Sequence, residues 1–307
     1  MILVQPILSV RDLAARLGIE AGYLREVGRD IESHYKIQPL KQGAKVRMLA
    51  IPQAELKMIQ RRINRAILAK VPLAKAVYGG VAGGSPRKNA AEHANQRCVI
   101  TMDVKHFFPN VRHYMVYRMF RSELGFGRDV ASILTRLTTY RSYLPQGAPT
   151  STAVANLLLA APVDVPMSAE AERQGVRYSR FVDDIAISGE NPRPLINKVA
   201  KLLSSRRLPV HRRKINGPSK LRIAPSGVAQ RITGLIVNAQ NGLSVPRERR
   251  DKVRAAIYAL RRAPKHELKK AVASIRGKIT HIAQFNAAAA KRLNTYLDGT
   301  LRQRLDG

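Results

Sequence analysis

The sequence predicts an α+β protein, because short strand-like segments occur among helical stretches in the first part of the chain and a wholly helical part follows. Residues 45–51 alternate between polar and apolar side chains, residues 98–103 form a short apolar run, and residues 178–188 hold two apolar runs around an acidic pair. From residue 244 onward the apolar positions follow helical spacing. With 307 residues, 45% of them hydrophobic, the chain can bury a core and holds one large domain or two to three small ones.

The first expected element is a pair of helices. Ser9 has an acid three residues further on, which is typical of a capping box, and apolar residues keep helical spacing on both sides of a break at Gly18. A helix-turn-helix and two simply packed helices both agree with this pattern. Residues 45–51 then predict a strand, Pro52 is expected to begin a helix, and the glycines and serine of 79–86 indicate a loop.

The middle of the chain is expected to alternate between strands and helices. Residues 98–103 predict a short buried strand, after which come helical stretches and a rigid loop at 144–149. Thr150 or Ser151 is expected to cap the next helix. The longest apolar stretch, 153–163, is interrupted by an asparagine and a proline and is too short to span a bilayer.

The last part of the chain is expected to be a basic helical segment. Three apolar stripes, which include Val253, Val272 and Leu297, predict three helices. Residues 244–307 carry 16 Lys and Arg against 5 Asp and Glu, a net charge of +11. A charged outer face is normal for such helices, but the single sign of this charge favours a surface that binds a nucleic-acid backbone.

The overall charge indicates a polyanionic partner. Lys and Arg number 54 against 21 acidic residues, for a formal net charge of +33. Nucleic acid is the expected partner, and an acidic membrane surface is the alternative. The N-terminus lacks the basic region of a signal peptide, and the single Cys98 excludes an intramolecular disulfide and a cysteine-based zinc site. We therefore expect a cytoplasmic protein.

Asp183 and Asp184 are the only adjacent acidic residues in the chain. Their flanks are β-branched or aromatic and too short for helices, so the segment predicts a β-hairpin whose turn exposes both carboxylates. Adjacent like charges are destabilising unless a cation binds them, and hard divalent ions take carboxylate oxygens. Asp103, at the end of its strand, could cap a turn, or could join the pair to hold two Mg²⁺ ions about 4 Å apart.

The order of four motifs resembles the reverse transcriptases. These motifs are Asp103 at a strand end with Phe108 five residues later, Leu-Pro-Gln-Gly at 144–147, Phe-Val-Asp-Asp at 181–184, and a lysine further on. The family usually has Tyr-Ala-Asp-Asp, and the replacements here keep an apolar strand leading to the acids. The resemblance covers about residues 45–240. It implies a right-hand polymerase fold with an antiparallel palm sheet, mainly helical fingers and a helical thumb.

A narrower resemblance is to the retron reverse transcriptases. Those enzymes have an Asn-Ala-x-x-His motif before the first aspartate and a Val-Thr-Gly motif beyond the lysine; here Asn89-Ala-Ala-Glu-His93 and Ile232-Thr-Gly occur. The resemblance implies priming from the 2′-hydroxyl of an internal guanosine, a branched RNA–DNA product, and an effector protein in antiphage defence. Asn89 and His93 would share one face of a helix, and a structural hydrogen bond and an RNA contact are both open for them.

The resemblance also assigns residues to binding roles. Residues matched to the nucleotide site are Lys45, Arg47, Phe108, Gln146, Gly147 and Lys214. The Phe108 ring would exclude the ribose 2′-hydroxyl, Arg47 would grip the triphosphate, Lys214 would lie near the leaving pyrophosphate, and Gly147 would let the backbone approach the nucleotide. A core aromatic and exposed strand cations are the plain alternatives. Residues expected to contact RNA are Asn89, His93, Arg212, Arg213, Arg261 and Arg262.

We therefore expect an RNA-directed DNA polymerase with Asp103, Asp183 and Asp184 as catalytic metal ligands. Residues 1–100 would form the N-terminal helices and fingers, 101–240 the palm with some finger elements, and 241–307 the thumb. Expected partners are a structured non-coding RNA, its cDNA, dNTPs and an effector protein, with no membrane. The alternatives are a group II intron-like or other defence reverse transcriptase primed from a 3′-hydroxyl, and a non-catalytic nucleic-acid-binding protein.

Overall fold

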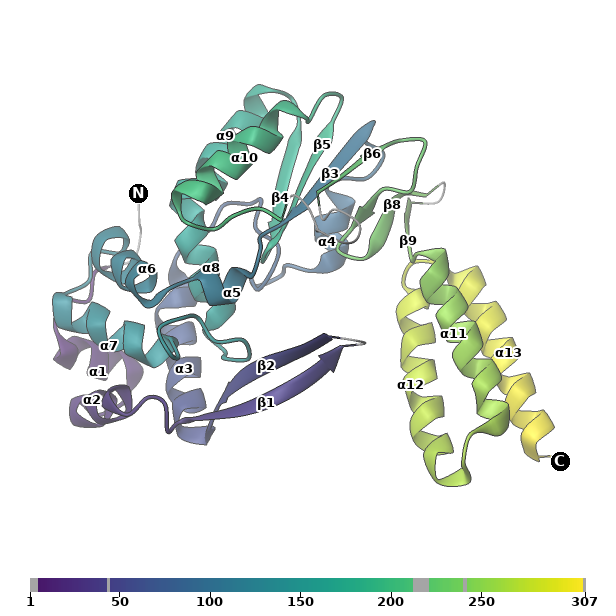
Figure 1. The fold of residues 1–307 in the computed structure, drawn as a ribbon, viewed down its shortest axis with the longest axis horizontal. Helices are drawn as coiled ribbons and strands as arrows, with labels where there is room; N and C mark the ends of the chain where they lie inside the picture. Colours follow the sequence, from purple (N-terminus) through teal and green to yellow (C-terminus); the bar gives the residue numbers. More distant parts are fainter. Residues whose placement is uncertain (1–4, 43–44, 212–220, 240–241, 306–307) are drawn as a thin grey trace. The chain divides into compact units, whose positions relative to one another are not determined.

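A computed structural model describes residues 5–42, 45–211, 221–239 and 242–305 (Figure 1). The chain divides into two compact units. Unit 1 comprises residues 1–85 and 100–223, and unit 2 comprises residues 86–99 and 224–307. Both units are therefore discontinuous in sequence. The boundaries expected for fingers, palm and thumb are a functional division and stay a prediction.

The N-terminal helices of unit 1 confirm Ser9 as the residue that caps the first helix. Helix α1 spans Val10–Leu17 and α2 spans Ala21–Arg29. The Asp12 N–H donates to the Ser9 hydroxyl at 3.1 Å, which satisfies one of the free donors at the start of α1. Gly18 ends α1 at a φ of +61°, a left-handed conformation that glycine adopts without strain.

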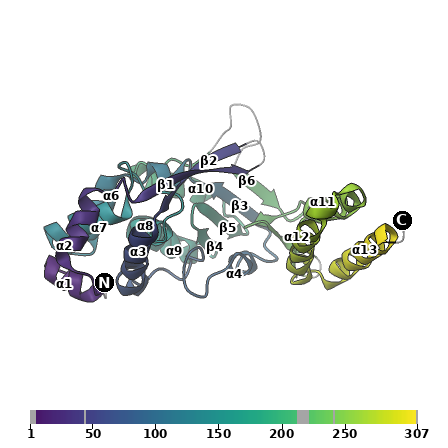
Figure 2. The same cartoon turned by 90° about the horizontal axis from the view of Figure 1, so that it is seen from below.

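A two-stranded hairpin follows, and only its second strand was predicted. Strand β1 spans Tyr35–Gln42 and β2 spans Lys45–Pro52, paired antiparallel along their whole length (Figure 2). Pro39 conceals β1 in the sequence, because proline cannot donate to a sheet and is tolerated only at an edge. Helix α3 spans Ala54–Ala66, so it begins two residues after Pro52.

Six further helices lie in the part of unit 1 that the structure describes. They are α5 (Phe107–Asn110), α6 (His113–Arg118), α7 (Arg128–Thr138), α8 (Ser151–Leu159), α9 (Val165–Arg173) and α10 (Pro194–Ser205). A 3₁₀ turn occupies Leu68–Lys70, and α6 continues into a π-helical turn at Met119–Glu123. A second π-helical turn, Ala160–Asp164, joins α8 to α9.

The run formed by α8, the π-helical turn and α9 is longer than the sequence indicated. It spans Ser151–Arg173, which is long and apolar enough to cross a membrane by length and composition alone, although core helices pass the same test. Half of its most apolar window is buried in the protein. Leu157, Leu158 and Leu159 are buried, and they pack as core residues of unit 1.

The central sheet has the strand order β4-β5-β3-β6. Its strands are β3 (Cys98–Asp103), β4 (Arg177–Phe181), β5 (Asp184–Gly189) and β6 (Arg222–Pro225). Consecutive residues of β4 and β5 are buried, so both faces of this part of the sheet are covered. In Figure 1, α9 and α10 lie beside these two strands. The predicted hairpin and the predicted strand 98–103 are both confirmed.

Unit 2 contains α4 (Pro86–Ala91), a small sheet and three long helices. The sheet comprises β7 (Arg231–Ile232), β8 (Leu235–Ala239) and β9 (Gly242–Ser244). The helices are α11 (Arg247–Ala259), α12 (Lys265–Ala283) and α13 (Ala287–Leu305), with a 3₁₀ turn at Leu260–Arg262. They pack on one another, and the apolar stripes predicted for them are buried at Val253, Ile275 and Leu297. The mixed helices and antiparallel strands confirm the predicted α+β class.

Candidate active site

The predicted acidic hairpin has a tight two-residue turn. Strands β4 and β5 are antiparallel, and Phe181 pairs with Asp184, which leaves Val182 and Asp183 at the turn. Val182 has a φ of +61°, and a β-branched residue adopts this left-handed region only when its surroundings hold it there. Asp183 is partly buried and Asp184 is exposed. The turn thus fixes the backbone that carries the first of the two aspartates.

The end of β3 lies against this turn. The Val104 N–H donates to the Asp183 carbonyl at 3.1 Å, so the end of β3 at Asp103 adjoins the β4–β5 turn that carries Asp183. The His211 N–H donates to the Asp103 carbonyl at 2.8 Å and fixes the strand end from its other side. The backbone at Asp103 therefore adjoins the backbone at Asp183, and the predicted convergence of the three carboxylates stays a prediction.

Three carboxylates form the candidate donor set for a divalent metal ion. Carboxylate oxygens are ligands that Mg²⁺ prefers, and Asp103, Asp183 and Asp184 supply them. Among the described residues, however, no group of three or more His, Cys, Asp or Glu side chains is gathered so that it could hold a metal ion. Mg²⁺ is usually bound by one or two carboxylates together with water and substrate phosphates. The backbone brings the Asp103 and Asp183 positions together, and metal binding by their carboxylates stays a prediction.

A buried polar network lies directly behind the acidic turn. Arg180 of β4 and Asp164 of the π-helical turn are both fully buried. The Arg180 guanidinium donates from Nε to Asp164 Oδ1 at 2.8 Å and from Nη2 to Asp164 Oδ2 at 2.6 Å, so the two residues form a bidentate ion pair. Its Nη1 donates to the Val182 carbonyl at 2.9 Å and to Asn156 Oδ1 at 2.8 Å. Arg180 therefore ties the left-handed turn residue to the core.

Tyr178 completes the same network. Its hydroxyl donates to Asp164 Oδ1 at 2.8 Å. Burial, and then the neighbouring Asp164 carboxylate, raises the pKa of Tyr178 well above its usual value. The phenol therefore stays protonated and remains a donor. Asp164 thus accepts hydrogen bonds from two side chains of β4, one of them a cation, which is how a carboxylate is tolerated without solvent.

The backbone around Gly79 supports the turn from another side. Asn156 Nδ2 donates to the Gly79 carbonyl at 2.8 Å, and the Tyr78 N–H donates to the Arg180 carbonyl at 2.9 Å. A Cβ atom at Gly79 would lie only 2.5 Å from the Val182 nitrogen. No side chain fits there, so glycine is required for the close approach of the two backbones.

The loop predicted to lie beneath the nucleotide packs on β2. The Ala50 N–H donates to the Gln146 carbonyl at 2.9 Å, and Gly147 has a φ of +114°. Arg47, three residues before Ala50 on the same strand, is exposed. Phe108 lies on α5, partly exposed, with its ring 5.6 Å from that of Phe107. The structure thus brings the loop together with the strand that carries Arg47.

Other predicted residues lie elsewhere or outside the described chain. Lys214, Arg212 and Arg213 fall outside the described residues, and of Lys45 only the backbone is described, paired with Gln42 in the hairpin.

The predicted RNA-contacting residues of unit 2 differ in exposure. Arg261 and Arg262 are exposed after α11. Asn89 and His93 are buried, and α4 ends at Ala91, so His93 lies beyond the helix that the pair was expected to share. Burial favours the structural role that the sequence left open for these two residues. An RNA contact stays a prediction.

Sequence reasoning missed Arg180, Asp164 and Asn156. A signal was present, because an arginine interrupts the apolar approach to the acidic pair and an aspartate interrupts the apolar helix. Either residue alone reads as a surface charge. Only the fold shows that the two charges meet in the core.

Comparisons with known proteins agree with this geometry. Residues 39–224 match the family model described as reverse transcriptase (RNA-dependent DNA polymerase). The chain belongs to the reverse transcriptase family and is an RNA-directed DNA polymerase of the retron type.

Two retron relatives illustrate this assignment. The chain is 32% identical to the Retron Mx65 reverse transcriptase of Myxococcus xanthus, an alignment that covers 92% of this chain and 69% of that protein. It is 28% identical to the Retron Ec86 reverse transcriptase of Escherichia coli, covering 94% and 88%. A solved telomerase from Candida albicans, in complex with a telomeric RNA fragment, has a TM-score of 0.47 at 9% identity over 93% of this chain and 64% of that one.

Proposed function

We propose that Asp103, Asp183 and Asp184 are the catalytic carboxylates of this polymerase and that they bind two Mg²⁺ ions with the substrate phosphates. The observation that carries this proposal is the 3.1 Å hydrogen bond from the Val104 N–H to the Asp183 carbonyl, which makes the Asp103 and Asp183 positions neighbours. Bound divalent ions would activate the attacking hydroxyl and offset charge on the leaving pyrophosphate. The chain's own contribution is to hold these carboxylates on two strand ends braced by the core.

The nucleotide would lie beside β2 and the loop at 144–149. Gly147 offers backbone without a side chain, and Arg47 is an exposed cation on the adjoining strand that could pair with phosphate oxygens. Phe108 is proposed to exclude the ribose 2′-hydroxyl by contact with its ring. Gln146, Lys45 and Lys214 are assigned to the same site because their motif positions match the family.

We further propose that synthesis is primed by a 2′-hydroxyl inside a structured non-coding RNA and leaves a branched RNA–DNA product. The support is the similarity to retron enzymes together with the sequences at 89–93 and 232–234. An effector protein and an antiphage role belong to the same proposal. Priming from a 3′-hydroxyl is the alternative.

The metal assignment is tested by Asp183→Asn, which keeps the side-chain volume and removes the charge. Single-nucleotide addition on an RNA template with Mg²⁺ should fall below detection, whereas RNA affinity should stay within about twofold. Asp129→Asn is the matched control, because Asp129 is an exposed acid on α7 and should leave the rate unchanged. Extension by the Asp183 variant at a rate near that of the wild type would defeat the assignment.

The priming assignment needs a separate assay. The RNA encoded next to the gene would be prepared with a single 2′-deoxyguanosine at the priming position. Covalent RNA–DNA product should then disappear, although extension of an annealed DNA primer on the same RNA should continue. Unchanged product from the deoxy-substituted RNA would establish the 3′-hydroxyl alternative.

A further inference from the structure

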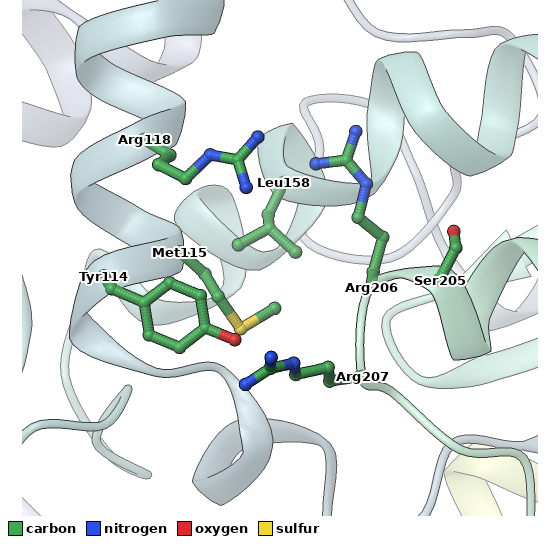
Figure 3. A pocket seen from close by; sticks show the side chains of 7 residues that line it. All are labelled: Tyr114, Met115, Arg118, Leu158, Ser205, Arg206 and Arg207. Carbon is green, nitrogen blue, oxygen red and sulfur yellow. The ribbon is translucent and has the colours of Figure 1, made fainter.

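Unit 1 contains a basic pocket that includes none of the residues assigned to the active site. It has a volume of about 240 Å³ and lies between α6, α8 and the end of α10 (Figure 3). Its apolar floor is formed by Met115 and Leu158, which are 8% and 2% exposed. Figure 3 shows Arg118 and Arg206 facing each other across this floor, with Arg207 reaching toward Tyr114.

The positive charges around the pocket are only partly compensated by acidic residues. Three of its lining residues are arginines and none is acidic. Arg206 is held in place by Glu123 at 3.2 Å, whereas Arg118 has no ion-pair partner among the residues that the structure describes. Like charges that face one cavity repel each other, and an anion placed between them removes that repulsion. Guanidinium groups bind phosphate oxygens in a two-pronged geometry.

A purely structural explanation accounts for only part of this arrangement. Arg206 and Arg207 follow the last residue of α10, and cations are stabilised at the negative end of a helix. The helix dipole does not explain Arg118 in the same way, because its helix continues for another turn through Glu123. Arg207 is moreover held at a φ of +56°, which is unfavourable for a residue with a side chain.

An aromatic side chain stands beside the three cations. Tyr114 is 44% exposed although it is a large ring, and the Arg207 guanidinium lies 5.9 Å from the centre of that ring. Exposed aromatic rings and guanidinium planes are the surfaces on which proteins stack unpaired bases of RNA. Phosphate donors and a stacking surface therefore occur together.

We propose that this pocket binds one nucleotide of single-stranded RNA, with its phosphate among Arg118, Arg206 and Arg207 and its base on Tyr114. The volume favours part of a polymer over a free nucleotide, because pockets that enclose a whole small ligand usually measure roughly 300–1,000 Å³. The site would anchor RNA away from the reacting atoms. The proposal rests on the polymerase class of the chain and is independent of how synthesis is primed.

The test uses the full chain and a fluorescein-labelled ten-nucleotide single-stranded RNA, with affinity measured by fluorescence anisotropy. The double variant Arg118→Gln with Arg207→Gln should weaken binding about tenfold or more. The slope of log K against log salt should become shallower by up to roughly 0.7, the value expected for the loss of one phosphate contact to a single strand. Arg193→Gln is the matched control, because Arg193 is exposed at the opposite end of α10.

Tyr114 separates stacking from charge. Tyr114→Ala should weaken binding about fivefold or more, whereas Tyr114→Phe should bind like the wild type, because stacking is worth roughly 1 kcal/mol or more per base. If only the arginine variants weaken binding, and inorganic phosphate competes with the RNA, the stacking half of the proposal is wrong. If the double variant keeps the wild-type affinity and salt slope, the whole proposal fails, and an acidic segment of a protein partner becomes the better occupant.

Two measurements keep these results independent of folding and of the proposed chemistry. Thermal unfolding of each variant should match that of the wild type, since the chosen arginines have no ion-pair partner among the described residues. The rate of nucleotide addition at saturating template should be unchanged, and only the template concentration needed for half-maximal rate should rise. Loss of the saturated rate would show that the pocket belongs to the reaction centre and would overturn its role as a remote anchor.

Discussion

The pair formed by Arg180 and Asp164 should connect the stability of the core to the rate of polymerisation. Both side chains are fully buried, and two hydrogen bonds of 2.6 and 2.8 Å join them. Asp164→Leu leaves the Arg180 charge in the core without a partner, and removing one member of such a pair costs about 3–5 kcal/mol. Since domains are stable by about 5–15 kcal/mol, the variant should remain folded but unfold at a clearly lower urea concentration.

The double variant makes the test specific. Asp164→Leu with Arg180→Met replaces both charges by hydrocarbon and should recover most of the lost stability, because apolar replacement of a buried pair is often neutral or stabilising. Nucleotide addition should not recover, since methionine cannot donate to the Val182 carbonyl, which accepts from Arg180 at 2.9 Å. Urea unfolding of the single and double variants gives the coupling energy of the pair. The rate of nucleotide addition is measured under single-turnover conditions, at a urea concentration at which every variant is still folded.

Two outcomes would refute this reasoning. If Asp164→Leu and the single variant Arg180→Met each lower the free energy of unfolding by less than about 1 kcal/mol, the pair is not the mutually dependent unit that its burial implies. If the double variant regains activity together with stability, Arg180 does not hold the acidic turn in place.

Three further predictions follow from individual contacts. Gly79→Ala should slow nucleotide addition and destabilise the fold by about 1–3 kcal/mol, because the new Cβ would lie 2.5 Å from the Val182 nitrogen. Gly299→Ala in α13 is the control, because a Cβ there has no neighbouring atom within 4 Å, and it should be neutral or stabilising. Equal effects of the two substitutions would contradict the predicted clash. Phe108→Ala should raise the ratio of kcat/KM for ribonucleotides to kcat/KM for deoxyribonucleotides. Tyr258→Ala is the control and should leave this ratio unchanged. An unchanged ratio for Phe108→Ala as well would show that Phe108 does not discriminate between the sugars. Hydrogen bonds lower the pKa of Glu170 from 4.5 to about 2, and they come from the side chains of Arg173, Lys198 and Gln174. Glu170→Gln should therefore lower the melting temperature above pH 4.5, and the difference from the wild type should vanish as the pH falls toward 2. A difference that does not change with pH would contradict the ionic contribution.

Local patterns predicted the parts of the fold that local chemistry determines. The helices of unit 2 follow from apolar stripes, α1 follows from the Ser9 cap, and the hairpin follows from short β-prone flanks around an acidic pair. Strand β1 escaped prediction because Pro39 argues against a strand in the middle of a sheet, although a two-stranded hairpin tolerates it at an edge. The sheet of unit 2 escaped because two- to five-residue strands carry little periodicity.

The candidate site was predictable in its acids and not in their support. Acidic residues in a strongly basic chain are conspicuous, and their order matched a family pattern. The role of Arg180 depends on Asp164 and Asn156, which lie 16 and 24 residues away and reach it only through tertiary packing. The burial of Asn89 and His93 could likewise not be predicted, because α4 is too short for its sequence pattern to indicate which side chains are buried.

The left-handed backbone at Val182 limits how far the tetrapeptide 181–184 can be moved between proteins. A β-branched side chain such as that of valine meets a penalty of about 1–2 kcal/mol in that conformation, so this residue does not favour the turn on its own. Its shape is imposed by residues outside the tetrapeptide: Arg180, which precedes it on β4, and Asn156 and Gly79, which come from two distant stretches of chain. If the four residues were transplanted into an unrelated hairpin, the sequence of the motif would be kept but its backbone conformation would be lost.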